Sequence, residues 1–133
     1  AGLVYWFPKM SGRMLDEKAS LASFLFIQGG FQVLYLGMFI AGAEGQPRRV
    51  ADFANQYATS NIISTGGAYL IGLGFIVLLW AVVHSWRHGE IAPMNPWGAK
   101  SLEWTVLYPV PLVNFDTPPV VTSDPYGFGR SEK

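Results

Sequence analysis

Two long uncharged stretches dominate the pattern of apolar and polar positions along the chain. Residues 19–43 hold no charged side chain, and in residues 53–86 the only titratable groups are two tyrosines and one histidine. The hydrocarbon core of a bilayer needs about 20 apolar residues per helix, so each stretch is long enough to cross it once. The pattern predicts membrane-spanning helices over 19–42 and 62–84.

The segments around these spans are polar or are broken by proline and glycine. Residues 1–8 are aromatic and apolar and stop at Pro8, which lacks a backbone N–H and disfavours helix before it. They predict the end of a further membrane helix. Residues 9–18 form a polar connection, and residues 43–61 form a loop with glycine, proline and charge. Residues 85–133 carry repeated prolines and no helical period, which predicts an extended tail ordered by docking on partners.

Small and polar residues mark the second predicted span. Ser60 or Asn61 suits its N-cap, because either side chain can accept a hydrogen bond from a free backbone N–H. Small residues in a membrane helix let a neighbouring helix approach closely, so we expect this span to pack against protein on at least one side. The small residues concerned are Gly66, Gly67, Gly72 and Gly74.

The basic residues near the membrane predict the orientation of the two spans. Both chain ends share one side of the membrane, and they carry more basic residues than the central loop on the other side. Cytoplasmic loops are enriched in lysine and arginine, so both ends are expected on the cytoplasmic or matrix side. The residues counted are Lys9, Arg13, Lys18 and Arg87 at the ends, and Arg48 and Arg49 in the loop.

Charge and cysteine content remove several classes of function. The chain has nine basic and nine acidic residues, and therefore no strongly basic surface for a nucleic acid. It has no cysteine, which excludes disulfides and thiolate metal centres. Membrane lipids are an expected partner of the two spans, and a nucleic acid is not.

Arg48 and Arg49 are the most informative polar residues, because two adjacent guanidiniums lie on the side expected to be poor in positive charge. A guanidinium pairs bidentately with a carboxylate, so the pair could clamp buried anionic groups. The commoner role of such a pair is a solvated loop charge or a contact with lipid phosphate. Asp52 could orient an arginine or be an ordinary polar loop residue.

Few other residues could carry chemistry. His84 and His88 have the spacing at which two imidazoles can share a metal ion, although interfacial anchoring is their ordinary role. Met38 and Tyr35 are formally possible haem ligands, but such residues are more often packing residues. Neither span contains a carboxylate that could relay protons. The chain alone is therefore expected to have no catalytic residue, no metal site and no enzymatic activity.

Several segments, taken in order, resemble the C-terminal end of subunit I of the haem–copper terminal oxidases, the cytochrome c oxidase family. The resemblance extends over nearly the whole chain up to about Tyr126. The segments are Tyr5 to Met14 (YWFPKMSGRM), Gly45 to Arg49 (GQPRR), Asn61 to Gly67 (NIISTGG), Asn95 to Trp104 (NPWGAKSLEW), Pro109 to Pro111 (PVP) and Asn114 to Asp116 (NFD).

This resemblance implies an all-α membrane protein that supplies the end of the tenth helix and the last two helices of a twelve-helix bundle. It implies that Arg48 and Arg49 bind the propionates of two haems on the outer side. The haems and copper B would be ligated by the N-terminal part of subunit I, and CuA would lie elsewhere in the complex. The implied partners are that N-terminal part, subunits II and III and, indirectly, cytochrome c. The implied activity is reduction of O2 to water coupled to proton pumping.

The sequence also departs from the family pattern. Gln46 replaces a common methionine, Val50 and Phe53 replace common tyrosines, and Glu44 could pair with an arginine. The short length favours a subunit I split into two polypeptides, and hence the mitochondrial inner membrane, with a bacterial plasma membrane as the alternative. Two rival interpretations stay open: a small two-helix accessory subunit, and an independent haem protein with Met38 or His84 as ligand.

Overall fold

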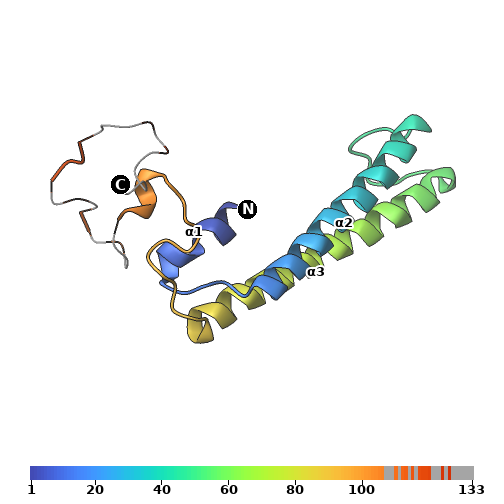
Figure 1. The fold of residues 1–133 in the computed structure, drawn as a ribbon. Coiled ribbons are helices and arrows are strands. Elements are labelled where there is room, and N and C mark those ends of the chain that lie inside the picture. Colours follow the sequence, from blue (N-terminus) through green and yellow to red (C-terminus); the bar gives the residue numbers. More distant parts are fainter. Residues whose placement is uncertain are drawn as a thin grey trace. The chain divides into compact units, whose positions relative to one another are not determined.

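The computed structural model describes residues 1–106, 110, 112–113, 115, 117–120, 124 and 126. In these residues every regular element is helical, which confirms the all-α class (Figure 1). The elements are α1 (Gly2–Ser11), α2 (Glu17–Ala43), η1 (Asn55–Tyr57), α3 (Ala58–His88) and η2 (Leu102–Trp104). The chain forms two compact units, residues 17–82 and residues 1–16 with those from 83 onward.

Helices α2 and α3 are both long and apolar enough to cross a membrane, as predicted. Each extends beyond the predicted span at both ends, because an uncharged stretch reveals only the part of a helix suited to lipid. The predicted N-cap is wrong. Ser60 and Asn61 lie inside the first turn of α3, which begins at Ala58 directly after η1.

The two long helices lie side by side and run in opposite directions (Figure 1). Their buried residues are all small, and one set of them recurs every seven positions along each helix. Seven residues are close to two helical turns, so this repeat keeps the small residues on one face. The residues are Ser23, Gly30 and Gly37 on α2, and Ser60, Gly67, Gly74 and Ala81 on α3.

Glycine is required where these backbones meet. A Cβ atom on Gly30 would lie 2.8 Å from the carbonyl oxygen of Gly67, and one on Gly67 would meet the backbone of Leu34. Ser23 Oγ donates a hydrogen bond of 2.9 Å to the Gly74 carbonyl across the same interface. The expected close packing of α3 is therefore made by Gly67 and Gly74. Nothing lies within 4 Å of a Cβ on the other two predicted glycines, Gly66 and Gly72.

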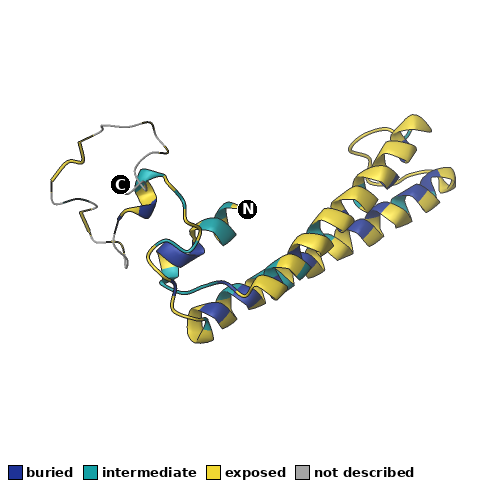
Figure 2. Ribbon diagram, viewed as in Figure 1, coloured by how far each residue is buried: buried dark blue, intermediate teal, exposed yellow. Residues whose placement is uncertain are grey.

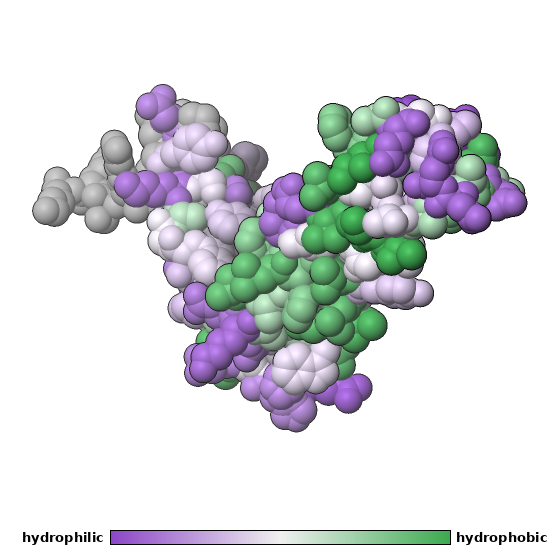
Figure 3. Space-filling view, turned by 90° about the vertical axis from the view of Figure 1, so that its right-hand side faces the viewer, coloured by the Kyte–Doolittle hydropathy of each residue, from purple (hydrophilic) through white to green (hydrophobic). Residues whose placement is uncertain are grey.

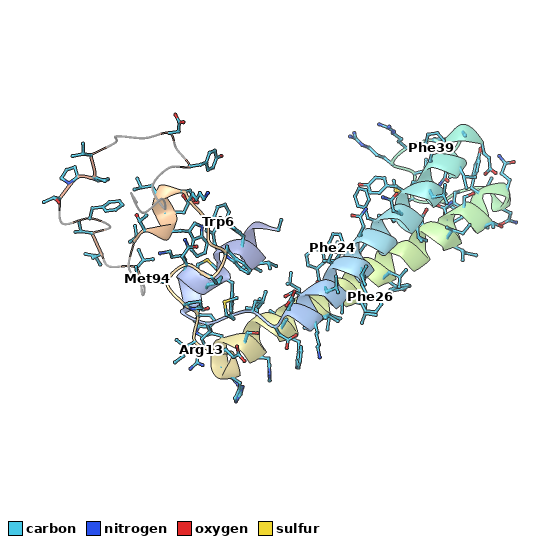
Figure 4. The ribbon with its side chains drawn as sticks, viewed as in Figure 1. Trp6, Arg13, Phe24, Phe26, Phe39 and Met94 are labelled. Atoms are coloured by element: carbon cyan, nitrogen blue, oxygen red, sulfur yellow. The ribbon has the colours of Figure 1, made fainter. Side chains whose placement is uncertain are left out.

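The outer surface of this helical hairpin is apolar. Most residues away from the α2–α3 interface are exposed (Figure 2). Hydrophobic residues cover much of the face seen in Figure 3, and hydrophilic residues gather where α2 turns toward α3. Phe24 and Phe39, exposed by 58% and 78%, project outward from α2 (Figure 4). Such a surface is typical of helices surrounded by lipid or by other membrane helices.

Helix α1 does not end at Pro8 as predicted, but continues to Ser11. Proline removes only the hydrogen bond that its own N–H would make, and the following turn keeps its bonds. Gly12 then ends the helix in a left-handed conformation with φ of 72°, and its N–H donates to the Pro8 carbonyl at 2.8 Å. The helix thus tolerates proline and stops at glycine.

The segment after α3 folds back on the α1–α2 connection instead of forming a wholly extended tail. The Met14 N–H donates to the Glu90 carbonyl at 2.8 Å, and the Arg13 guanidinium, labelled in Figure 4, donates to the Gly89 carbonyl at 2.6 Å. Farther along, Trp97 Nε1 donates to the Tyr5 carbonyl at 2.9 Å. These hydrogen bonds tie the segment up to Trp97 to residues near the start of the chain. The predicted tail segments around Pro109, Pro111, Asn114, Asp116 and Pro125 lie outside the described residues.

Candidate functional site

The C-terminus of α2 sets the direction of the connection that carries the arginine pair. Gly45 has φ of 92°, its N–H donates to the Gly42 carbonyl at 3.1 Å, and the Gln46 N–H donates to the Ala41 carbonyl at 3.0 Å. This is a Schellman motif, which satisfies carbonyls that the helix end would leave free. Pro47 follows directly and cannot continue the helix. The chain therefore leaves α2 along a defined path.

A side-chain hydrogen bond ties this helix end to α3. Asn61 Nδ2 donates to Gln46 Oε1 at 3.0 Å and to the Tyr57 carbonyl at 2.8 Å. Tyr57 is buried, and its hydroxyl lies 3.5 Å from the Glu44 carbonyl, at the outer limit of hydrogen-bonding distance. The residue before Pro47 is thus held through its backbone by α2 and through its side chain by α3.

Arg48 and Arg49 form the turn that follows, and both are exposed. Arg49 has φ of 59°, in the left-handed region. This conformation costs a residue with a Cβ roughly 1–2 kcal/mol relative to the right-handed one. The turn at Arg49 therefore runs against the ordinary backbone preference of arginine.

The two guanidiniums carry positive charge that the neighbouring residues do not neutralise. Within the part of the chain that the structure describes, neither side chain has a hydrogen bond or an ion pair with a protein group. Glu44 forms no ion pair with them there, although its position in the sequence allowed one. The Asp52 carboxylate instead accepts the N–H of Phe53 at 2.8 Å, as an ordinary loop residue does. Two adjacent unpaired guanidiniums suit a ligand that presents carboxylate groups.

The structure places the other candidate ligands on α2 and α3. His84 and His88 are exposed near the end of α3, with ring centroids 5.3 Å apart. In the described residues no group of three or more histidines, cysteines or carboxylates is placed to hold a metal ion. Met38 is exposed on α2, and the Tyr35 ring packs on Phe31 at a centroid distance of 4.3 Å. These positions give neither side chain the buried setting of a haem ligand.

A second polar cluster surrounds Lys9, which is only 9% exposed. Its ammonium group donates to the carbonyl of Val106 and lies 5.5 Å from the centroid of the Trp104 ring. Burial lowers the pKa of Lys9, and the carboxylate of Glu103 opposes this by favouring the charged form. The cluster joins α1 to η2, and nothing in the residue pattern singled it out.

The hydrogen bond between Gln46 and Asn61 was not predicted from the sequence either. Gln46 stood out only as a departure from a family pattern, and Asn61 only as a possible N-cap. Gln46 follows α2 and Asn61 lies in α3, fifteen residues later, so no periodic pattern links them and only the fold brings the two amides together. The one available hint is that both residues flank the arginine loop with side chains able to hydrogen-bond.

These features define a membrane-type helical hairpin with an unpaired arginine pair at its connection, as seen in the described residues. Residues 1–70 match the protein family described as cytochrome c and quinol oxidase polypeptide I, and the chain belongs to this family. It is 41% identical over 129 residues to cytochrome c oxidase subunit 1 of Thermostichus vulcanus, with 97% of the chain aligned. The subunit 1 proteins of Corynebacterium diphtheriae and Synechocystis are 41% and 36% identical over 93% and 97% of the chain.

The alignments cover only part of these relatives. The chain spans 23% of the length of each of the three proteins. It therefore corresponds to a segment of subunit I, and the resemblance seen in the sequence motifs is confirmed.

Proposed function

We propose that the chain forms the C-terminal part of subunit I in a proton-pumping cytochrome c oxidase, which reduces O2 to water. In this proposal α2 and α3 are the last two helices of the subunit, and Arg48 and Arg49 bind haem propionates. The observation that carries the proposal is the exposed arginine pair. It follows Gln46, which is hydrogen-bonded to α3, and no carboxylate among the described residues neutralises it. Family membership over residues 1–70 supports the same role.

The arginines fit this ligand on chemical grounds. Two haems present four propionate carboxylates, and a guanidinium offers a planar fork that matches a carboxylate. Near a bilayer the effective dielectric constant is low, so unpaired carboxylates would be costly and fixed cations stabilise them strongly. When bound, the haems supply the electron transfer to O2. The residues of this chain would hold the carboxylates and set the local charge, while the haem and copper B ligands and CuA lie elsewhere in the complex.

The proposed surroundings are those of a subunit I segment within an oxidase complex. The N-terminal part of subunit I would complete the helix bundle, subunits II and III and lipid would contact its outside, and cytochrome c would bind elsewhere in the complex. The three relatives named above come from bacteria, so we favour a bacterial plasma membrane over the mitochondrial inner membrane. The proposal is the same whether this segment is continuous with the preceding helices or forms a separate polypeptide.

The test replaces Arg48 and Arg49 with glutamine, singly and together, in the intact complex. Loss of a fixed cation beside the haem carboxylates should lower the haem midpoint potentials, because the oxidised haem carries one more positive charge than the reduced haem. We expect the double variant to lose about tenfold or more in turnover, equivalent to one charge-assisted hydrogen bond. The measurements are redox titration of the optical spectrum and oxygen consumption.

Arg87→Gln is the matched control, because Arg87 is an exposed arginine at the other end of α3. It should leave both quantities unchanged. Normal haem potentials in the double variant would contradict the proposal and favour a small accessory subunit whose arginines face lipid or solvent.

A further inference from the structure

We propose that Gln46 and Asn61 are positioning residues for the arginine pair, acting through the hydrogen bond between their side-chain amides. This inference rests on the proposed function, because it concerns how Arg48 and Arg49 are presented to haem carboxylates. It adds two residues that do not touch the ligand. Its basis is the geometry of the connection between α2 and α3.

Gln46 is fixed from two sides. Its backbone N–H caps α2 through the Ala41 carbonyl at 3.0 Å, and its side-chain oxygen accepts from Asn61 at 3.0 Å. The same Asn61 amide group also donates to the Tyr57 carbonyl at 2.8 Å, one turn earlier in the chain. The Asn61 side chain is thereby oriented by α3 before it reaches Gln46.

Gln46 is close to the arginines along the backbone. Only Pro47 separates Gln46 from Arg48, and the proline ring restricts its own φ to one region. The arginine turn therefore starts from a restrained point, and Arg49 adopts its left-handed conformation two residues later. Without the hydrogen bond between the two side-chain amides, the connection would keep its attachment to α2 and lose its attachment to α3.

The guanidiniums have no protein partner in the described residues, so no ion pair within the chain holds them in place. Long side chains of this kind are restrained mainly by where their backbone is fixed. Freedom at the base of the turn spreads the cations over a larger volume and weakens the field that they exert at a carboxylate.

The test uses Gln46→Met and Asn61→Ala in the intact complex, singly and together. Methionine keeps the length of glutamine without an oxygen that could accept the hydrogen bond. Both single variants should lower the haem midpoint potentials in the same direction as Arg48→Gln or Arg49→Gln, by a smaller amount. The double variant should shift the potentials no further than the larger single variant, because both changes remove the same bond.

Thr65→Val is the matched control. The Thr65 hydroxyl donates to the Asn61 carbonyl at 2.8 Å, so this variant removes a hydrogen bond from the same turn of α3 without touching the connection. It should leave the potentials unchanged. A shift equal to that of Asn61→Ala would mean that general loosening of α3 is the cause, and would overturn the inference.

A variant with exchanged amides covers the case in which the first variants do not retain haem. Gln46→Asn shortens one side chain by one methylene, and adding Asn61→Gln restores the combined length. The exchanged pair should recover haem binding and potentials that Gln46→Asn alone does not, whereas a pair no better than the single variant would overturn the inference. Unchanged potentials in the Gln46 and Asn61 variants, with shifted potentials in the arginine variants, would reject the positioning role alone. Unchanged potentials in the arginine variants would reject the proposed function itself.

Discussion

Lys9 shows how one residue can couple two segments far apart in sequence. Its ammonium group is buried against Trp104, and it donates to the carbonyl of Val106 on the segment that follows α3. Burying a charge is unfavourable unless hydrogen bonds and opposite charge compensate it. The compensation here comes from one carbonyl, one aromatic face and the carboxylate of Glu103.

The pKa of Lys9 gives a prediction about pH. Because burial lowers this pKa below 10.5, the folded chain binds the Lys9 proton more weakly than the unfolded chain does. Between the folded value and 10.5 the unfolded chain therefore holds more protons, and the free energy of unfolding contributed by Lys9 rises with pH. This contribution to the free energy of unfolding is lost as the pH falls through the pKa of Lys9 in the folded chain. The difference in thermal midpoint between the native chain and Lys9→Met, followed from pH 7 to 11, should show this rise.

Direct titration checks the same assignment. The ¹³Cε signal of Lys9, identified by its absence in Lys9→Met, should titrate below 10.5, and Glu103→Gln should lower its pKa further. Glu90→Gln is the control, because Glu90 is an exposed acid of the same segment. A Lys9 pKa at or above 10.5 would contradict the assignment.

The helical hairpin of α2 and α3 depends on small residues at specific positions. Gly67→Ala places a methyl group against the backbone of Leu34 and the carbonyl of Gly30, so α2 and α3 must separate. We expect a loss of about 1–3 kcal/mol in the free energy of unfolding. The neighbouring Gly66→Ala meets nothing within 4 Å and should be neutral or stabilising by up to about 1 kcal/mol, since alanine favours helix. Thermal unfolding in detergent compares the two, and equal losses would contradict the assigned interface.

The existence of both long helices could be predicted from the sequence, because an apolar stretch of this length without charge is typical of a helix that crosses a bilayer. Which glycines meet α2 could not be predicted from composition alone. Gly66 and Gly67 are adjacent, yet only the second lies on the buried face. The seven-residue repeat of small residues was present in the sequence and would have selected Gly67 and Gly74. The end of α1 does not follow from Pro8, because the helix continues to Gly12, whose left-handed backbone ends it.

The residue types of the candidate site can be predicted from the sequence, whereas its geometry cannot. Two adjacent arginines in a loop could be recognised in the sequence, whereas their lack of a protein partner in the described residues could not. Glu44 and Asp52 are near enough in sequence to pair with them, and the fold directs neither carboxylate to them. The hydrogen bond from the Asn61 amide to the Gln46 amide forms only because α2 and α3 pack together, and no local sequence pattern predicts that packing. Sequence patterns thus indicate chemistry, and packing determines which groups are left to bind a ligand.

The basic residues of the chain predict its orientation in the membrane. Helix α3 has 31 residues and rises roughly 46 Å at 1.5 Å per residue, enough to carry the chain across a bilayer. The basic residues near the chain ends predict that the arginine connection is on the outer side and the ends on the inner side. Because the chain has no cysteine, Asp52→Cys and Glu90→Cys would each introduce a single thiol at an exposed position. In intact cells an impermeant thiol reagent should label the thiol at position 52, and label position 90 only after the membrane is opened. The reverse pattern would place the arginine pair on the inner side, and would exclude outer-side haem carboxylates as its ligand.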